Sequence, residues 1–573
     1  MLYYSDERWS VSAAEALGAV RARLAAARAG ASHEALIALL VEASALAQGV
    51  ADAQRDLAGR DEGAPASTAA LEVVRAAAAA VWGSWRGRAP GLAHVEAALA
   101  GFARAEDVPP ILTLRVPEGH VQYGVFPELF GEAARRAGGA APLAIGIRTI
   151  GVGLAAMVAA ATGNGEVVTV RPVGPPFERR VELGGRLASR LRAAVAAGER
   201  FAVVDEGPGL SGSSFAAVAR WLADAGCPPD RVTIFPAHAA TPGPASSAAT
   251  RDWWERSEKH VVPFAAALRP RLEAWAAREL GAAGVVDLSA GGWRAYVPGA
   301  AEVPVFRQQE RLKLLARSPV GAYVLRFAGL GRYFEEARAR ALAVSEAGFA
   351  PPMMAAPHGF LAQRWVEGRP PEPGELSRER WFSHLARYLA LRARMPPARP
   401  GAGHPGALFQ ALRVNAGEAL GAEAAEAAEA FEEGAAAAAA LPRCAVDGKL
   451  ERWEWLVAAD GALAKADAVD HALGHDLAGA QPIGWDVAAG ALELELGPGA
   501  ARELDVRVAA AGGPATPPAA LAFFEAAYLA HRIGRWTYAL SAESDAADRR
   551  RIATALDRYR RLLAAALARG PRC

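Results

Sequence analysis

Cysteine is scarce in this sequence of 573 residues, and neither sign of charge is in excess. The three cysteines, Cys227, Cys444 and Cys573, are too few and too widely spaced to form a disulfide framework or a Cys-x-x-Cys metal site. The 63 basic and 62 acidic residues nearly cancel, so the net charge does not indicate binding to nucleic acid or to a membrane surface. A reducing compartment is the simplest environment for such a chain.

Targeting signals and long hydrophobic runs are also missing. The first ten residues, MLYYSDERWS, are polar and charged, unlike a signal peptide. An apolar run such as 151–163 is shorter than the roughly 20 residues that span a bilayer. We therefore expect a cytoplasmic protein without a membrane partner.

The chain is long enough for about two to four domains, and its texture changes twice. Residues 1–105 follow Ala-rich helical patterns. Residues 106–300 alternate helical segments with the β-rich runs ILTLRV, LAIGI, EVVTV, FAVVD and RVTIF, which predicts a helix-covered parallel sheet. Residues 301–573 begin with paired strands and continue as mostly helical sequence. The predicted fold is multidomain: a helical N-terminal region, an α/β parallel-sheet domain and a two-lobed α+β domain.

The strongest candidate site follows the β-rich run FAVVDE. This run ends in two carboxylates, Asp205 and Glu206, and continues as GPGLSGSS into a helical segment. Small residues after a parallel strand let backbone N–H groups converge on a phosphate, and the helix amino terminus adds a favourable dipole. The carboxylates can accept hydrogen bonds from sugar hydroxyls or act on them through Mg²⁺. The pattern indicates a sugar-phosphate site.

This stretch resembles the signature of type I phosphoribosyltransferases, although the spacer GPGL is one residue longer than usual and serines replace threonines. The resemblance implies that Asp205 and Glu206 are the catalytic residues, which hold the ribose hydroxyls of phosphoribosyl pyrophosphate and bind Mg²⁺. It also implies that the following small residues surround the 5′-phosphate: Ser211, Gly212, Ser213 and Ser214. The resemblance does not identify the small molecule or base that accepts the phosphoribosyl group.

An upstream segment favours the same interpretation. The sequence LAIGIRTIGVGLAA predicts a strand, a tight loop and a helix, in the order of the pyrophosphate loop of that family. The resemblance implies that Arg148 and Thr149 contact the pyrophosphate. Arginine suits this role because its fork of N–H donors matches phosphate oxygens.

The same segment allows a rival interpretation. Gly151, Gly153 and Ala156 satisfy the pattern G-x-G-x-x-A of dinucleotide sites, and Arg171 could contact a 2′-phosphate. An NADP-binding protein is therefore an alternative. It leaves the Asp205 loop unexplained, and the acidic residue expected on the ribose is missing from the next strand.

The last domain resembles aminoglycoside phosphotransferase-like kinases in the run AYVLRFAG and in the block from Val446 to Ala488. The resemblance implies that Arg326 is the basic residue at the nucleotide, with Glu335 or Glu336 as its partner. It places Asp467 at the metal-binding aspartate and Glu454 at the metal-binding asparagine, so that ATP and Mg²⁺ are the implied cofactors.

One position departs from the kinase pattern. Lys449 falls where a carboxylate orients the acceptor hydroxyl, and lysine cannot do this. Asp447 is a substitute candidate. The whole sequence predicts a phosphoribosyl-transferring enzyme with a kinase-like domain. That domain either phosphorylates a product or, if it is inactive as a kinase, regulates the enzyme. A non-catalytic sensor or scaffold for nucleotides and sugar phosphates is the other alternative. The pathway and oligomeric state are not predicted.

Overall fold

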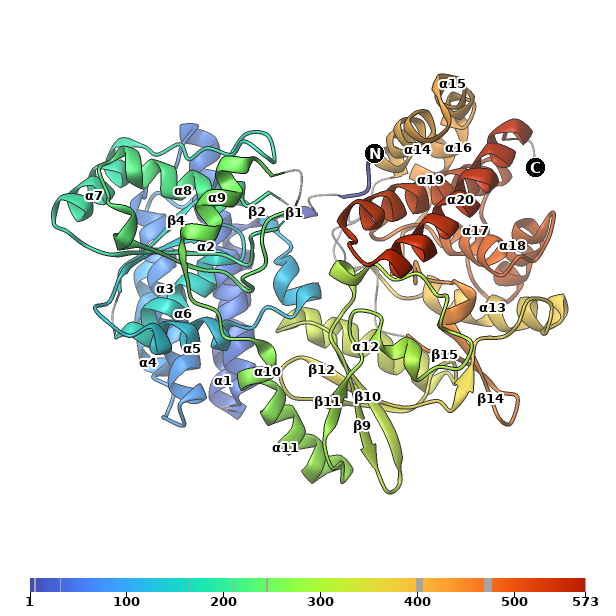
Figure 1. Ribbon diagram of the computed structural model, residues 1–573, viewed down its shortest axis with the longest axis horizontal. Coiled ribbons are helices and arrows are strands. Elements are labelled where there is room, and N and C mark those ends of the chain that lie inside the picture. Colours follow the sequence, from blue (N-terminus) through green and yellow to red (C-terminus); the bar gives the residue numbers. More distant parts are fainter. Residues whose placement is uncertain are drawn as a thin grey trace.

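The structure is a computed structural model. In Figure 1 the N-terminal half, blue to green, lies to the left, and the C-terminal third, orange to red, lies to the right. A small sheet in yellow-green lies below and between them. The residues that the structure describes are 1–4, 7–30, 32–163, 165–209, 211–243, 246–397, 405–467 and 477–571.

The N-terminal region is helical, as predicted. It holds α1 (Ala13–Gly30), α2 (His33–Ala58), α3 (Pro65–Trp85) and α4 (Leu92–Phe102). The side chain of Ser32 caps the start of α2, and Gly59 ends this helix with a positive φ of 72°. Within the described ranges, α2 alone is long and apolar enough to cross a membrane, yet 89% of its apolar stretch is buried inside the protein. We therefore interpret α2 as a core helix.

A five-stranded parallel sheet follows, in the order β4-β3-β5-β6-β7, which confirms the predicted parallel sheet. Its central strands are buried along their whole length, because helices cover both faces of a parallel sheet. The strands are β3 (Leu143–Ile147), β4 (Val167–Val170), β5 (Phe201–Val204), β6 (Val232–Phe235) and β7 (Glu258–Lys259). The helices are α5 (Pro127–Ala137), α6 (Gly151–Thr162), α7 (Gly185–Ala196), α8 (Ser213–Asp224) and α9 (Ala248–Arg256).

One predicted strand does not join this sheet. The run Ile111–Arg115 forms β2, which pairs antiparallel with β1 (Arg8–Ser12) in a separate two-stranded sheet. Leu112 and Leu114 alternate onto one face and contact α2 at Gly49, where an added Cβ would lie 2.7 Å from Leu114. A helix thus buries the apolar face of β2, and the alternating pattern does not reveal which sheet a strand joins.

The small sheet is antiparallel, in the order β11-β12-β10-β9-β8. It confirms the predicted pairing of the first two strands of the last region, although it also recruits β8 from before residue 300. Its strands are β8 (Val285–Asp287), β9 (Lys313–Ser318), β10 (Gly321–Phe327), β11 (Met353–Ala356) and β12 (Phe360–Arg364). The neighbouring helices are α10 (Phe264–Ala267), α11 (Arg269–Leu280) and α12 (Arg332–Glu346).

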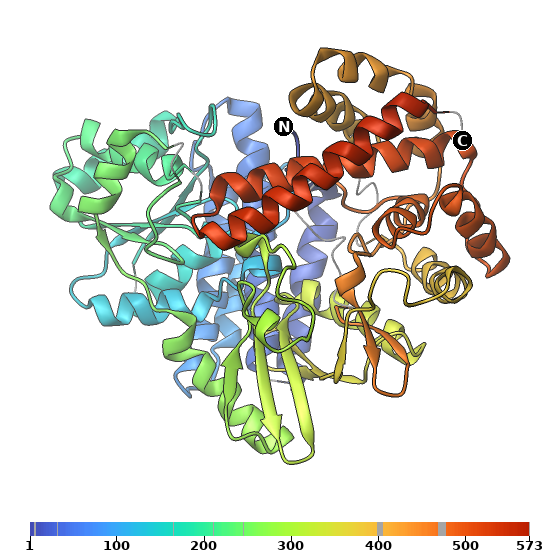
Figure 2. The same cartoon turned by 45° about the vertical axis from the view of Figure 1, so that its right-hand side comes forward.

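The C-terminal region is mostly helical, and Figure 2 shows its last two long helices side by side. A three-stranded sheet lies at its junction with the small sheet and consists of β13 (Gly368–Arg369), β14 (Trp455–Ala458) and β15 (Leu463–Lys465). The helices are α13 (Arg378–Ala393), α14 (Pro405–Leu420), α15 (Ala422–Glu429), α16 (Glu432–Ala439), α17 (Gly484–Glu493), α18 (Ala500–Ala510), α19 (Pro518–Ala542) and α20 (Ala546–Arg569).

Two large hydrophobic cores hold the chain together. The first extends from the N-terminal helices through α6 into the small sheet, where it includes Phe327 and Phe360. The second fills the C-terminal helical region and includes Tyr3 from the start of the chain. The backbone N–H of Leu2 also donates to Asn415 of α14, at 2.6 Å. One core therefore crosses both predicted domain boundaries, and the division at residues 105 and 300 stays a prediction.

Candidate functional site

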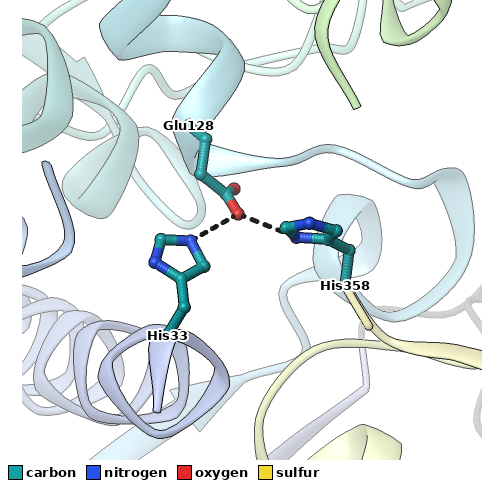
Figure 3. Close-up of side chains that lie close together, drawn as sticks. All are labelled: His33, Glu128 and His358. Atoms are coloured by element: carbon teal, nitrogen blue, oxygen red, sulfur yellow. Dashed lines mark hydrogen bonds and ion pairs between the residues drawn. The ribbon is translucent and has the colours of Figure 1, made fainter. Parts of the chain in front are cut away.

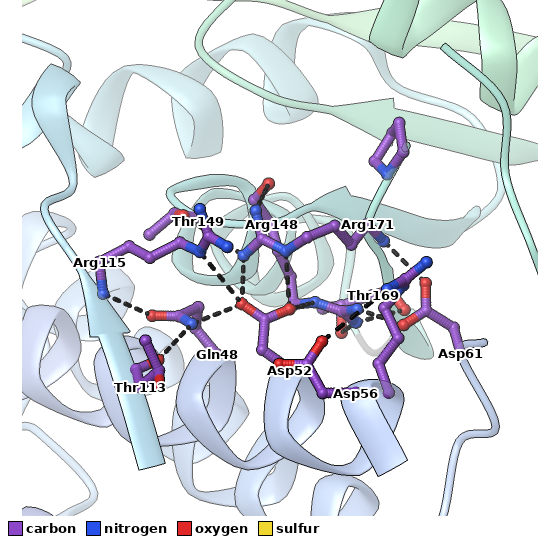
Figure 4. A network of polar contacts seen from close by, with 12 residues as sticks. Gln48, Asp52, Asp56, Asp61, Thr113, Arg115, Arg148, Thr149, Thr169 and Arg171 are labelled. Atoms are coloured by element: carbon purple, nitrogen blue, oxygen red, sulfur yellow. Dashed lines mark hydrogen bonds and ion pairs between the residues drawn. The ribbon is translucent and has the colours of Figure 1, made fainter. Parts of the chain in front are cut away.

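Arg148 lies in a buried network of charges between the parallel sheet and α2 (Figure 4). Its Nε donates to Asp52 Oδ1 at 2.9 Å, and its Nη2 pairs with Asp61. Its Nη1 donates to the backbone oxygen of Thr169 at 3.2 Å. Arg171, which follows β4, donates its Nε to the same Asp52 at 2.7 Å. Two arginines from the sheet thus share carboxylates that come from α2 and the loop after it.

The charges of this network compensate one another. Burial raises the pKa of Asp52, and the neighbouring Arg148 and Arg171 lower it by more, to about 2. Asp52 is therefore ionised at neutral pH, and the side chain of Arg148 is only 1% exposed. The sequence predicted Arg148 at a pyrophosphate, but the structure commits its donors to protein acceptors. Thr149 lies beside it, with its Oγ1 3.5 Å from Nη2 of Arg171.

Sequence reasoning missed both carboxylate partners. Asp52 and Asp61 precede Arg148 by 96 and 87 residues and lie in a region in which no chemistry was predicted. The same packing explains the glycines of the dinucleotide pattern. An added Cβ on Gly151 would lie 2.6 Å from the backbone oxygen of Val204, and one on Gly153 would lie 2.6 Å from Ser44 Oγ of α2. Both glycines therefore let α6 approach the sheet and α2 closely.

Asp205 and Glu206 lie side by side after β5, as the sequence indicates. Burial, together with Glu206, raises the pKa of Asp205 well above its ordinary value. Burial raises the pKa of Glu206 to about 7, although a hydrogen bond from the backbone of Gly119 lowers it. This pair therefore binds protons more tightly than exposed carboxylates do.

The loop that follows is bound to the rest of the protein. Ser213 Oγ donates to the backbone oxygen of Pro176 at 2.6 Å and lies 2.9 Å from Ser211 Oγ. Gly212 has a positive φ of 63°, and an added Cβ there would lie 2.7 Å from Pro242. Ser214 continues the first turn of α8, while Leu210 lies outside the described residues. The hydroxyl of Ser213, which was predicted to bind phosphate, is thus used inside the protein.

Arg326 and Asp467 meet at the junction of the small sheet and the helical region. Arg326 is on β10 and Asp467 follows β15, and both are buried. They form an ion pair, and Arg326 Nη2 also donates to the backbone oxygen of Ala466 at 3.2 Å. Glu335, a predicted partner of Arg326, instead forms an exposed bidentate ion pair with Arg23 of α1, at 2.6 and 2.8 Å. The prediction for Glu335 is corrected accordingly.

A buried lysine that the sequence analysis did not single out lies behind this pair. Lys465 Nζ lies 3.4 Å from Asp447 and 3.7 Å from Glu454, and it donates to the backbone oxygen of Lys449 at 2.8 Å. Burial lowers the pKa of Lys465, but these carboxylates raise it by more, so the net shift is upward. Lys465 was detectable only as a charged residue in a short apolar strand.

The loop at Asp447 is fixed by Asp486. The carboxylate of Asp486, on α17, accepts the backbone N–H groups of Asp447 and Gly448 at 2.6 and 3.0 Å. Burial raises the pKa of Asp486 to about 6, and the nearby Asp447 adds to this rise. Tyr388 donates its hydroxyl to Asp447. Asp447 is therefore already bound by several protein groups.

Lys449, Glu454 and Asp467 line one small cavity of about 60 Å³ at this junction, beside Trp453 and Trp536. Burial lowers the pKa of Lys449. Two carboxylate side chains in one cavity have the oxygen donors that Mg²⁺ prefers. The volume holds only about two waters and is well below the roughly 300 Å³ of an ordinary ligand pocket. The residue types fit a metal and phosphate site, and the cavity is small.

The chain matches no family model, and no curated protein matches it. A choline kinase from Streptococcus pneumoniae is similar in structure, with 13% identity and a TM-score of 0.36 over 52% of this chain and 99% of the kinase. A choline/ethanolamine kinase family protein from Mesorhizobium loti has 16% identity and a TM-score of 0.30, over 48% of this chain and 96% of that protein. A spectinomycin phosphotransferase, in complex with ADP and spectinomycin, has 10% identity and a TM-score of 0.34, over 52% of this chain and 98% of that protein.

These findings correct the predicted function. The similar solved structures are kinases and phosphotransferases, which contradicts the prediction that the chain transfers a phosphoribosyl group from phosphoribosyl pyrophosphate. The positions of Arg148 and Ser213 give the physical reason, because protein acceptors already take their donors. The predicted similarity to kinases over about half of the chain agrees with these comparisons.

Proposed function

We propose that residues 301–573 form a phosphotransferase domain that binds ATP with Mg²⁺ at the junction of the small sheet and the helical region. The observation that carries this proposal is the meeting of Arg326 and Asp467. A buried cation from the central strand of the small sheet and a buried carboxylate from the helical region converge on one point. Opposite charges held on two separate elements are suited to bind phosphate and metal between them.

In this proposal Arg326 exchanges Asp467 for phosphate oxygens, since a guanidinium fork matches either acceptor. Asp467 and Glu454 would then hold Mg²⁺, which supplies charge neutralisation at the phosphates. Lys465 keeps Glu454 and Asp447 in place from behind. The ion pair must separate and the 60 Å³ cavity must widen before a nucleotide enters.

A second candidate function is favoured by Lys449. A lysine cannot orient an acceptor hydroxyl as a carboxylate does, and Asp447 is bound by Tyr388 and Lys465. The domain would then bind a nucleotide without transferring phosphate and would regulate the rest of the chain. The two candidates share the binding site and differ only in turnover.

Titration of the full-length chain with ATP, with and without Mg²⁺, tests the shared site. We expect Mg²⁺-dependent binding that Asp467→Asn abolishes, because the amide loses the charge that holds the metal. The matched control is Asp460→Asn, an exposed aspartate in the turn of the same hairpin, which should bind as wild type does.

Release of ADP with hydroxyl-bearing acceptors then separates the candidates. Acceptor-dependent ADP release establishes the phosphotransferase, whereas binding without release establishes the regulatory domain. Failure of the wild-type chain to bind ATP at millimolar concentration contradicts both.

A further inference from the structure

Three side chains from distant parts of the sequence meet outside the sites described above (Figure 3). His33 is the first residue of α2, Glu128 lies in the first turn of α5, and His358 lies between β11 and β12. His33 Nε2 is 3.0 Å from Glu128 Oε1, and His358 Nδ1 is 3.4 Å from the same oxygen. One ligand atom from each residue lies within 4.8 Å of the other two.

The cluster is buried and carries a negative charge at its centre. The side chains of Glu128, His358 and His33 are 2%, 7% and 17% exposed. The ring of Trp85 covers the cluster, with centroids 5.8 and 6.0 Å from those of His33 and His358. The carboxyl group of Glu128 therefore lies in a site that is largely shielded from water.

The second oxygen of Glu128 supplies an independent observation. Glu128 Oε2 is buried and has no hydrogen-bond partner among the described residues. Leaving a charged acceptor unsatisfied in the interior is costly, because it loses its hydration without replacement. A cation held by both oxygens of the Glu128 carboxylate would satisfy Oε2 as well as contact Oε1.

A hydroxyl fixes the orientation of His33 from behind. Ser84 Oγ lies 3.1 Å from His33 Nδ1, on the side of the ring away from Glu128. If His33 donates Nδ1–H to Ser84, the lone pair of Nε2 points at the cluster. Metal-binding histidines almost always have such a partner on the second nitrogen.

We propose that His33, Glu128 and His358 bind a Zn²⁺ ion that ties together α2, α5 and the turn between β11 and β12. Two imidazoles and one carboxylate form a known ligand set for zinc, with a fourth position open. Around a tetrahedral ion with bonds of about 2.0 Å, neighbouring ligand atoms lie about 3.3 Å apart. The separations of 3.0 and 3.4 Å from Glu128 Oε1 are close to this value.

Imidazole nitrogens select zinc over Mg²⁺ and Ca²⁺, which prefer oxygen ligands. Arg271 interacts electrostatically with Glu128, and its guanidinium lies 3.5 Å from the centre of the Trp85 ring. It adds positive charge near the cluster, which the carboxylate of Glu128 offsets. The ion would link the N-terminal helices to the small sheet. These elements lie far apart along the chain.

The test uses the full-length chain after treatment with a chelator, titrated with Zn²⁺ in competition with a chromophoric chelator. We expect wild type to bind one Zn²⁺ ion that His33→Gln and His358→Gln do not bind. The matched control is His94→Gln, an exposed histidine of α4, which should keep that ion. Ser84→Ala should weaken binding by about 10- to 100-fold, because it removes the group that orients His33.

Two results overturn the proposal. One is a wild-type chain that takes no Zn²⁺ from the competing chelator, and the other is retention of the ion by both His33→Gln and His358→Gln. If these variants do not fold, X-ray absorption at the zinc edge of the wild-type protein decides. Two imidazoles with oxygen support the site, and a sulfur ligand contradicts it.

Discussion

Arg148 and Arg326 are two buried arginines that the sequence places at phosphate sites, and in the structure each contacts carboxylates. Arg148 shares Asp52 with Arg171 and also pairs with Asp61. Arg326 pairs with Asp467, which follows the last strand of a separate sheet, and a small cavity adjoins that carboxylate. The first arrangement joins α2 to the parallel sheet. The second joins two different sheets beside a cavity.

The difference lies in what surrounds each arginine. Thr169 and the two carboxylates complete the hydrogen bonds of Arg148, and its side chain is 1% exposed. Arg326 Nε, in contrast, has no hydrogen-bond partner among the described residues. A buried arginine with its donors satisfied stabilises a fold, whereas one with a donor left over can still bind an anion. The motif around an arginine does not reveal which case applies.

The largest expected effect is on the Arg148 network. Asp52→Asn leaves Arg148 and Arg171 without their shared charge, and should lower the free energy of unfolding by about 3–5 kcal/mol. The exposed neighbour Asp56 on the same helix provides the control, since Asp56→Asn should change the free energy of unfolding by less than about 0.5 kcal/mol. Denaturant midpoints measure both. Equal midpoints for the two variants would show that the network does not stabilise the fold.

The next effect concerns the Arg326 site. Lys449→Asp restores a carboxylate where kinase-like chemistry needs one, and should raise ATP turnover by about 10²-fold if a missing general base limits the rate. Lys449→Met removes the same charge without adding a carboxylate and serves as the control. ADP release measures both variants. An equal rise in ATP turnover with Lys449→Met would show that the loss of the positive charge causes the gain.

A pH-dependent effect is expected at Glu206. Burial raises its pKa from 4.5 to about 7, so the folded state keeps a proton that the unfolded state releases between these values. Stability therefore falls as pH rises from about 4.5 to 7. Glu206→Gln should weaken this fall and raise the Tm above that of wild type at pH 8. The exposed Glu199→Gln is the control, and a Tm profile unchanged by Glu206→Gln would contradict the assignment.

The smallest effect is expected at the exposed pair between α1 and α12. Glu335→Gln breaks the ion pair with Arg23 and should cost at most about 1 kcal/mol, because water and salt screen exposed charges. ATP binding should be unchanged, since Glu335 does not contact Arg326. A loss of nucleotide affinity in this variant would restore the role that the sequence predicted for it.

Much of the fold could be predicted from local patterns. Alternating strands and helices correctly indicated the parallel sheet, and the paired strands predicted at the start of the last region are β9 and β10. The run Ile111–Arg115 was assigned to the wrong sheet. The alternation of its side chains indicates that one face is buried, but it does not indicate which element covers that face. Asp205 and Glu206 were found because they are adjacent in sequence. Lys465 was missed because its partners, Asp447 and Glu454, are not adjacent to it in the sequence.

The sequence by itself determined the helical N-terminal region, the parallel sheet and the adjacency of Asp205 to Glu206, because these depend on residues close together in the chain. Only the tertiary structure decided which carboxylates Arg148 and Arg326 meet and which histidines surround Glu128. His33, Glu128 and His358 span more than half of the chain, and Asp52 reaches Arg148 across 96 residues. The physical reason is that charges are neutralised by neighbours in space, and folding alone makes those neighbours.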